Sequence, residues 1–221
     1  MSNRETFLSR VGEAVRQGNQ AGKASPLPDR KGVGYQGGRT DAVGRFSVML
    51  QAAGGQFSQA ADAQQAVANV LQHIERLAVR RVLLGCEPVL ERLGLPKLLA
   101  ERGCEVTLAS ELVSEQGRSK FFAADIAITG VDYLIAETGT MVMLAKPDQP
   151  RTASLLPPVH IAIAERSQIL EDLFDLFERL DPKLMASCVT LITGPSKTGD
   201  IELKLVTGVH GPGEVHVILL D

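Results

Sequence analysis

The segment from Thr193 to Glu202 has the composition of an anion-binding loop and directly follows an apolar run that ends at Ile192. Glycines at 194 and 199 permit tight backbone turns. Backbone N–H groups, hydroxyls and one ammonium group can converge on an anion in such a loop. It is not a Walker A loop, since Gly-Lys-Thr does not occur, and a strand-to-helix turn capped by Ser or Thr is the alternative. The candidate ligand-binding residues are Gly194, Pro195, Ser196, Lys197, Thr198, Asp200 and Glu202.

A second candidate is the turn Glu137-Thr138-Gly139-Thr140, which interrupts two apolar runs. A carboxylate at a strand end is well placed to act as a general base or nucleophile, so Glu137 is the candidate catalytic residue. Thr138, Gly139 and Thr140 are candidate ligand-binding residues beside it. The alternative is a hairpin in which Thr-Gly only meets the needs of the turn.

His210 lies in the loop Gly208-Val209-His210-Gly211-Pro212 and is a further candidate ligand-binding residue. An imidazole can donate to a ligand and titrates near neutrality. His160 can equally be a hydrogen-bonded histidine near the core. The four histidines lack the spacing of metal ligands, so we expect no metal site.

The sequence supports neither a dinucleotide-binding motif nor an iron–sulfur cluster site. Residues 32–37 match G-x-G-x-x-G, but residues 26–31, Pro-Leu-Pro-Asp-Arg-Lys, are not the buried strand that a dinucleotide fingerprint requires. The chain has only three cysteines, at 86, 104 and 188, and cannot supply four thiolates to an iron–sulfur cluster. We therefore expect no cofactor in this chain.

The composition excludes several function classes. The 221 residues carry a net charge of -3, without the basic excess of a nucleic-acid binder. Aromatic residues make up 4% and Trp is absent, which argues against base-stacking platforms. No apolar run approaches the roughly 20 residues of a membrane span. Scattered cysteines and the polar start of the chain make the cytoplasm the expected compartment.

Hydrophobic periodicity predicts an α/β fold with a mostly parallel sheet and helices on both faces. An amphipathic helix at 3–16 and a Gly/Pro-rich stretch form an N-terminal arm, residues 1–39, before the main domain, residues 40–221. A further helix is expected to start at a Ser167 cap, and residues 188–192 are expected to form a buried strand. Ligands of such folds bind at the carboxyl ends of the strands.

Five segments together resemble the lactate-utilization (LUD) domain family, over about residues 40–221 and in the family's order. Gly199 departs from the family, which usually has Ala there. The segments are Ala124–Gly130, Ala136–Thr140, Leu156–Ile161, Gly194–Glu202 and Gly208–Pro212.

The resemblance implies a NagB/RpiA/CoA-transferase-like fold. It also implies a role beside two co-encoded iron–sulfur proteins that oxidise L-lactate to pyruvate. On this reading the chain is a non-redox subunit or accessory protein that binds a small anionic ligand, and the iron–sulfur clusters belong to its partners.

Two alternatives to this function stay open. One is a self-sufficient enzyme acting on a phosphate, acyl-CoA or nucleotide substrate with a CoA-transferase-like or isomerase-like site. Glu137-Thr138-Gly139 is similar to the nucleophile turn of CoA transferases, and Gly130-Val131-Asp132 resembles the acidic turn of ribose-phosphate isomerases. The other is an interaction module with a vestigial pocket.

Overall fold

A computed structural model describes residues 3–18, 41–113, 115–181, 186–198 and 206–221. The chain divides into two units, residues 1–33 and 34–221, and each is described by itself. In the first unit, helix α1 (Asn3–Gly18) forms where the apolar spacing predicts it. Its apolar residues Phe7, Leu8, Val11 and Val15 are all exposed.

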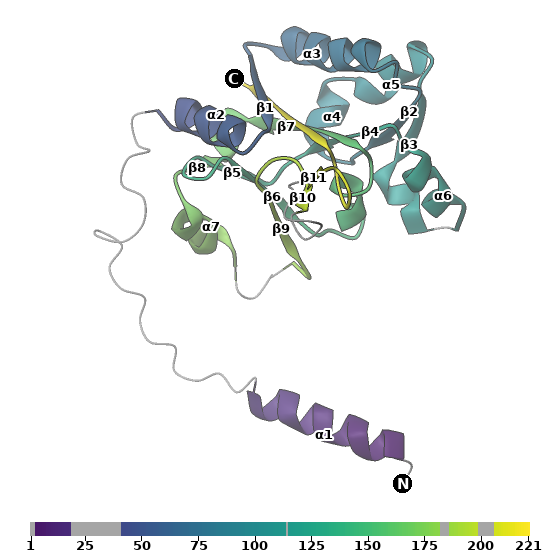
Figure 1. Cartoon of the computed structure of the whole chain (residues 1–221), viewed down its shortest axis with the longest axis vertical. Coiled ribbons are helices and arrows are strands. Elements are labelled where there is room, and N and C mark those ends of the chain that lie inside the picture. The colour runs from purple at the N-terminus through teal and green to yellow at the C-terminus, as the bar shows by residue number, and fades with distance from the viewer. Residues whose placement is uncertain (1–2, 19–40, 114, 182–185, 199–205) are drawn as a thin grey trace. The chain divides into compact units, whose positions relative to one another are not determined.

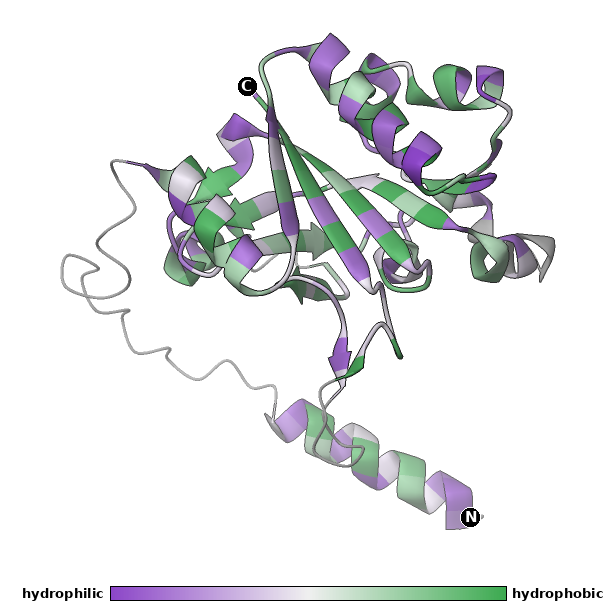
Figure 2. Ribbon diagram, turned by 45° about the horizontal axis from the view of Figure 1, so that its top comes forward, coloured by the Kyte–Doolittle hydropathy of each residue, from purple (hydrophilic) through white to green (hydrophobic). Residues whose placement is uncertain are grey.

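The second unit is built on a six-stranded sheet with the order β1-β12-β7-β4-β2-β3. All five pairs of neighbouring strands are parallel. This confirms the predicted fold class, and Figure 2 shows hydrophobic segments along these strands. The strands are β1 (Gln56–Ala60), β2 (Arg81–Leu84), β3 (Glu105–Leu108), β4 (Ile126–Gly130), β7 (Val159–Glu165) and β12 (Glu214–Leu220).

One face of this sheet carries large aliphatic side chains and is covered by helices α3 (Ala63–Arg76), α4 (Pro88–Arg92) and α5 (Leu95–Glu101) (Figure 1). Asp62 caps α3 by accepting from the Gln65 N–H. Alternation along each strand brings every second residue to this face. The buried sheet residues in this core are Ala60, Val82, Leu84, Ile126, Ile128, Ile161, Ile163 and Ile218.

The opposite face is lined partly by small residues, including Ala127, Ala162 and Ala164. Helix α2 (Ala42–Ala52) and a second sheet pack there, because the short side chains leave room for another layer. That sheet has the order β8-β5-β6-β9. Its strands are β5 (Tyr133–Ile135), β6 (Thr140–Leu144), β8 (Ile169–Leu170) and β9 (Val189–Ile192).

The remaining elements are short. Helix α6 (Glu115–Ala123) leads into β4, helix α7 (Leu173–Arg179) follows β8, and β10 (Lys197–Thr198) pairs with β11 (Val206–Thr207). Three single-turn helices, η2 (Ala109–Val113), η3 (Arg151–Ser154) and η4 (Arg166–Gln168), complete the described part of the chain. None of the described helices is long and apolar enough to cross a membrane.

Two predicted elements differ from the structure. Helix α7 is capped by Asp172, which accepts from the Asp175 N–H, and Ser167 does not begin it, because residues 169–170 pair with β5 instead. Strand β9 forms as predicted but lies in the second sheet, with Leu191 48% exposed, and is therefore not a buried strand. The G-x-G-x-x-G match at 32–37 lies outside the described residues.

His160 is a fully buried residue of β7, and its Nε2 lies 2.8 Å from the Thr129 hydroxyl of β4. Burial lowers the pKa of His160 to about 4, because the charged imidazolium would lose its water. These contacts support the interpretation of His160 as a hydrogen-bonded histidine of the core.

We predict that protein stability falls as the pH decreases from 6.5 towards 4. The unfolded imidazole takes up a proton below 6.5, whereas native His160 stays neutral until about pH 4. The stabilisation is therefore present above 6.5 and is lost by up to about 1.4 kcal/mol per pH unit below it. In urea unfolding experiments, His160→Gln should reduce the loss of stability between pH 6.5 and pH 4. The reduction should be partial, because His216 has a similarly lowered pKa and contributes to the same loss. An unchanged slope in the variant would contradict the assignment.

Candidate functional site

The Gly194 loop and the His210 loop meet at the edge of the central sheet where β7 and β12 begin. The Ser196 N–H donates to the Pro212 carbonyl at 2.8 Å, and the Gly213 N–H donates to the Pro158 carbonyl at 2.8 Å. Since residues 158 and 213 directly precede β7 and β12, this is the amino-terminal edge of the sheet. The described residues of these two loops thus lie opposite the carboxyl-terminal edge where such folds usually bind ligands.

A chain of three hydroxyl groups joins the Glu137 turn to the Gly194 loop. Thr138 and Thr140 have their hydroxyl oxygens 2.7 Å apart, and Thr140 lies 2.7 Å from the hydroxyl of Thr193. The antiparallel pairing of β6 with β9 brings these two segments together. Two candidate regions separated by more than 50 residues are therefore neighbours in the fold.

Lys197 places its charge at the end of helix α2. Its Nζ donates to the backbone carbonyl of Ala53, the C-cap residue of that helix. A cation is favourable there because the last carbonyls of a helix carry partial negative charge. Gly194, with φ of 94°, passes so close that a Cβ would lie 3.0 Å from the same carbonyl oxygen. Lys197 remains exposed and has two further Nζ protons for another acceptor.

The Glu137 turn rests on helix α2. The Glu137 N–H donates to the Glu171 carbonyl at 2.9 Å, and Arg45 of α2 reaches the Glu137 carbonyl at 3.5 Å. Gly139 has φ of 66°, and a Cβ there would lie 2.2 Å from the Leu50 nitrogen. The close approach explains the glycine, and Arg45 is a polar neighbour that sequence reasoning missed because it lies 92 residues away.

The remaining candidates divide into described and undescribed residues. His210 is exposed in the loop that precedes β12. Thr198 pairs with Val206 in an antiparallel ladder, so the described part of the segment after Gly194 continues as a strand, and the strand-to-helix alternative is wrong for that part. Asp200 and Glu202 lie outside the described residues. Ligand binding by this group of residues stays a prediction.

The carboxyl-terminal edge of the central sheet holds a group of polar residues, of which the sequence analysis noted only Asp132. A cavity of about 250 Å³ lies where β2, β4 and β7 end, and its lining includes Glu87, Arg92, Asp132, Lys146, Glu165 and Gln168. The pattern that could have revealed it occurs twice. A glycine at a strand end is followed two residues later by an acid, at Gly85-x-Glu87 and at Gly130-x-Asp132.

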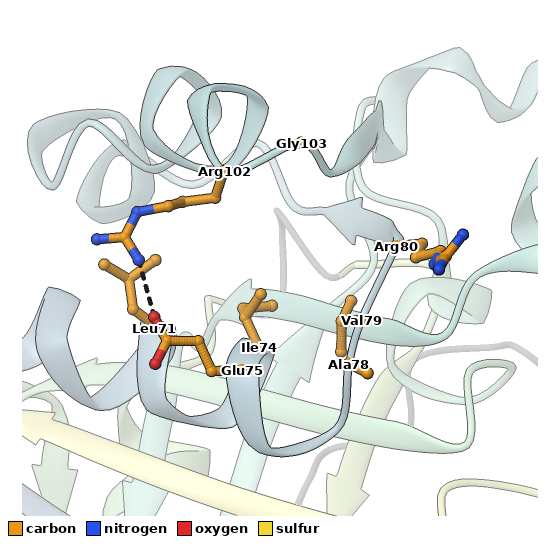
Figure 3. Close-up of a pocket in the computed structure, with 8 residues that line it drawn as sticks. All are labelled: Leu71, Ile74, Glu75, Ala78, Val79, Arg80, Arg102 and Gly103. Carbon is orange, nitrogen blue, oxygen red and sulfur yellow. Dashed lines mark hydrogen bonds and ion pairs between the residues drawn. The ribbon is translucent and has the colours of Figure 1, made fainter.

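A second cavity, of about 480 Å³, lies between α3 and the end of α5 (Figure 3). Its lining is apolar apart from three charged residues, and Arg102 is paired with Glu75 at 2.8 Å. Figure 3 shows the Arg80 side chain turned away from this pair. None of the candidate site residues within the described ranges lines this cavity, and its described lining has no set of convergent polar groups.

Metal ligation finds no support within the described ranges. No group of three or more His, Cys, Asp or Glu residues there could hold a metal ion. The three cysteines are free thiols, and Cys104 is buried. These thiols come from separate elements, at the end of β2, before β3 and before β9.

Comparisons with a family model and with individual proteins point to the same family. The model of the LUD domain matches residues 43–220. A protein of Halalkalibacterium halodurans named lactate utilization protein C is 36% identical over 163 residues, which are 72% of this chain and 69% of that protein. Its namesake from Anoxybacillus flavithermus is 36% identical over 133 residues, which are 59% of this chain and 58% of that protein.

One solved structure shows a similar fold. A DUF162 family protein from Deinococcus radiodurans aligns with a TM-score of 0.56 and 21% identity. The alignment covers 83% of this chain and 98% of that protein chain. At this identity the likeness supports the architecture and carries no information on the ligand.

We predict that Gly139→Ala destabilises the protein more than Gly103→Ala. Both glycines have positive φ, but a Cβ at Gly103 meets open space. The backbone strain should cost about 1–2 kcal/mol in each variant. The clash with α2 should add about 1–3 kcal/mol at Gly139 alone. Equal losses in urea unfolding would show that the Glu137 turn does not pack against α2 in solution.

Proposed function

This chain belongs to the LUD domain family, and from that premise we propose that it is a non-redox subunit or accessory protein of a system that oxidises L-lactate to pyruvate. The observation that carries the proposal is the match over residues 43–220 together with relatives named lactate utilization protein C. Those names describe the relatives, and we propose that this chain has the same role in lactate utilization.

The electron balance of the reaction supports an accessory role. Oxidation of L-lactate to pyruvate releases two electrons and two protons, so an acceptor must take up both electrons. Three cysteines cannot form the usual four-thiolate cluster site, and the only dinucleotide-like glycine pattern lacks its preceding strand in the sequence. We therefore assign electron transfer to iron–sulfur proteins that act with this chain.

We assign a small anionic ligand to the Gly194 loop. Lys197 keeps spare donors beside Ala53, and the hydroxyls of Thr138, Thr140 and Thr193 form a continuous chain next to Gly194. Hydroxyl and ammonium donors at a turn with backbone N–H groups are the chemistry that binds carboxylate or phosphate. The exposed His210 adds a possible donor from the neighbouring loop.

We predict that a strain lacking this chain fails to grow on L-lactate as sole carbon source and grows normally on glucose. The intact gene should restore growth. Lys197→Ala should restore it poorly, since the anion loses its only ammonium partner in the described loop. Lys97→Ala removes an exposed lysine on α5 and should restore growth fully.

Two results would contradict this assignment. Normal growth of the deletion strain on L-lactate would contradict the proposed role in lactate oxidation. Full rescue by Lys197→Ala, with unchanged thermal protection by inorganic phosphate, would contradict anion binding by the Gly194 loop. Because the lysine also caps α2, its loss is expected to lower stability by about 0.3–1 kcal/mol, and the amount of folded variant must be measured in parallel.

Glu137→Gln tests the alternative of a self-sufficient enzyme. The change preserves size and hydrogen bonding but removes the carboxylate that a nucleophile or base requires. For an accessory subunit we expect growth on L-lactate to be unchanged. A loss of growth with normal stability would instead favour catalysis by Glu137 on a substrate of this chain's own.

A further inference from the structure

Glu87 is a buried acidic residue at the carboxyl-terminal edge of the central sheet. It precedes helix α4 and is only 8% exposed. Both carboxyl oxygens are buried, and the nearby N–H groups of Gly130 and Glu87 itself do not reach full hydrogen-bond geometry with either of them. A buried carboxyl without a partner destabilises a fold, so its presence calls for a functional explanation.

Two glycines create the space for this carboxyl. A Cβ on Gly85, at the end of β2, would lie 3.3 Å from Glu87 Oε1 and closer still to Oε2. A Cβ on Gly130, the last residue of β4, would lie 2.7 Å from the Glu87 Cγ. Any side chain at either position would displace Glu87. The ends of two neighbouring strands are thus shaped to hold this group.

The cavity of about 250 Å³ adjoins this carboxyl. It lies at the carboxyl ends of β2, β4 and β7, where parallel α/β sheets place their ligands. Its volume is below the roughly 300 Å³ at which sites for drug-sized ligands begin, so it suits a small metabolite. The Gln168 amide fixes one wall by accepting from the Glu165 N–H and donating to the Val131 carbonyl.

The charged groups on the rim have unused donors. Asp132 is satisfied, because Oδ1 accepts from Lys146 and Oδ2 accepts from the Leu144 N–H, each at 2.7 Å. Glu165 is paired with Arg92. These ion pairs use one of the three Nζ protons of Lys146 and one terminal nitrogen of Arg92. The remaining N–H groups of Lys146 and Arg92 are therefore available as donors to an anion.

We propose that this cavity binds a small hydroxy- or oxo-carboxylate. Its carboxylate contacts Lys146 and Arg92 at the rim, and its hydroxyl or carbonyl oxygen pairs with the Glu87 carboxyl at the floor. A turn of the Glu87 side chain brings the carboxyl to that oxygen. This goes beyond the proposed function because it assigns a second site, on the opposite edge of the sheet from the Gly194 loop.

The direction in which the pKa of Glu87 is shifted suits an anionic ligand. Loss of water on burial raises the pKa of this carboxyl above its ordinary value of 4.5. The N–H groups of Gly130 and Glu87 itself and the charge of Lys146 oppose the rise, and Asp132 adds to it. A protonated carboxyl adds no repulsion and can donate a hydrogen bond. The charged or titratable residues around the cavity are Arg92, Asp132, Tyr133, Lys146 and Glu165.

The test is calorimetric titration of the full chain with L-lactate and with pyruvate from about pH 5 to pH 8. We expect saturable binding that weakens as the pH rises, by up to tenfold per pH unit once Glu87 ionises. Lactamide, which lacks the carboxylate, should not bind. Glu87→Gln mimics the protonated carboxyl, and its binding should persist without the pH dependence. Lys146→Met should weaken binding at least tenfold.

A matched control and the stability of the variants complete the test. Glu91→Gln changes an exposed carboxylate of the same helix and should bind as the wild type does. Glu87→Gln should unfold at a higher urea concentration than the wild type at neutral pH, and this advantage should vanish below pH 4.5, where the unfolded carboxyl is protonated as well.

Three outcomes would overturn the proposal. They are the absence of saturable binding, a pH dependence that persists in Glu87→Gln, and wild-type affinity in Lys146→Met. Loss of binding in Lys197→Ala with wild-type affinity in Lys146→Met would place the ligand at the Gly194 loop. The second site would then fail while the proposed function stands. Conversely, normal growth of the deletion strain leaves the binding data at Glu87 intact.

Discussion

The central parallel sheet must be covered on both faces, and this requirement determines where most of the other elements lie. One face meets helices with Val, Leu and Ile side chains, whereas the other presents alanines at 127, 162 and 164. Small residues allow a second sheet to approach closely. The second sheet then brings the Glu137 turn and the Gly194 loop together through the pairing of β6 with β9.

The same architecture creates two chemically different edges. At the amino-terminal edge, turns and hydroxyl groups are connected by hydrogen bonds, and Lys197 contributes to helix capping. At the carboxyl-terminal edge, the Glu87 carboxyl is buried between two glycines without a hydrogen bond of full geometry to a described residue. Satisfied groups stabilise a fold, whereas an unsatisfied buried group is tolerated mainly where it serves another purpose. The two edges thus differ in how much of their polar chemistry the fold itself uses.

Periodicity predicted the parallel sheet because its strands are continuous apolar runs, such as Ile126–Thr129 and Val159–Ile163. It failed at residues 167–172, where an apolar pair suits either a helix or a strand, and pairing with β5 decided the outcome. Local motifs revealed the Gly194 and Glu137 turns. They did not reveal Arg45 or Glu87, since the significance of each depends on contacts with segments far away in sequence.

The central claim is that this chain serves lactate oxidation without carrying the electrons. Its most direct test is L-lactate-dependent reduction of a dye by material captured through the full chain from cells grown on L-lactate, compared with the isolated chain. We predict that the captured material contains iron and reduces the dye, and that the isolated chain does not. Dye reduction by the isolated chain, or captured material with neither iron nor activity, would contradict the claim.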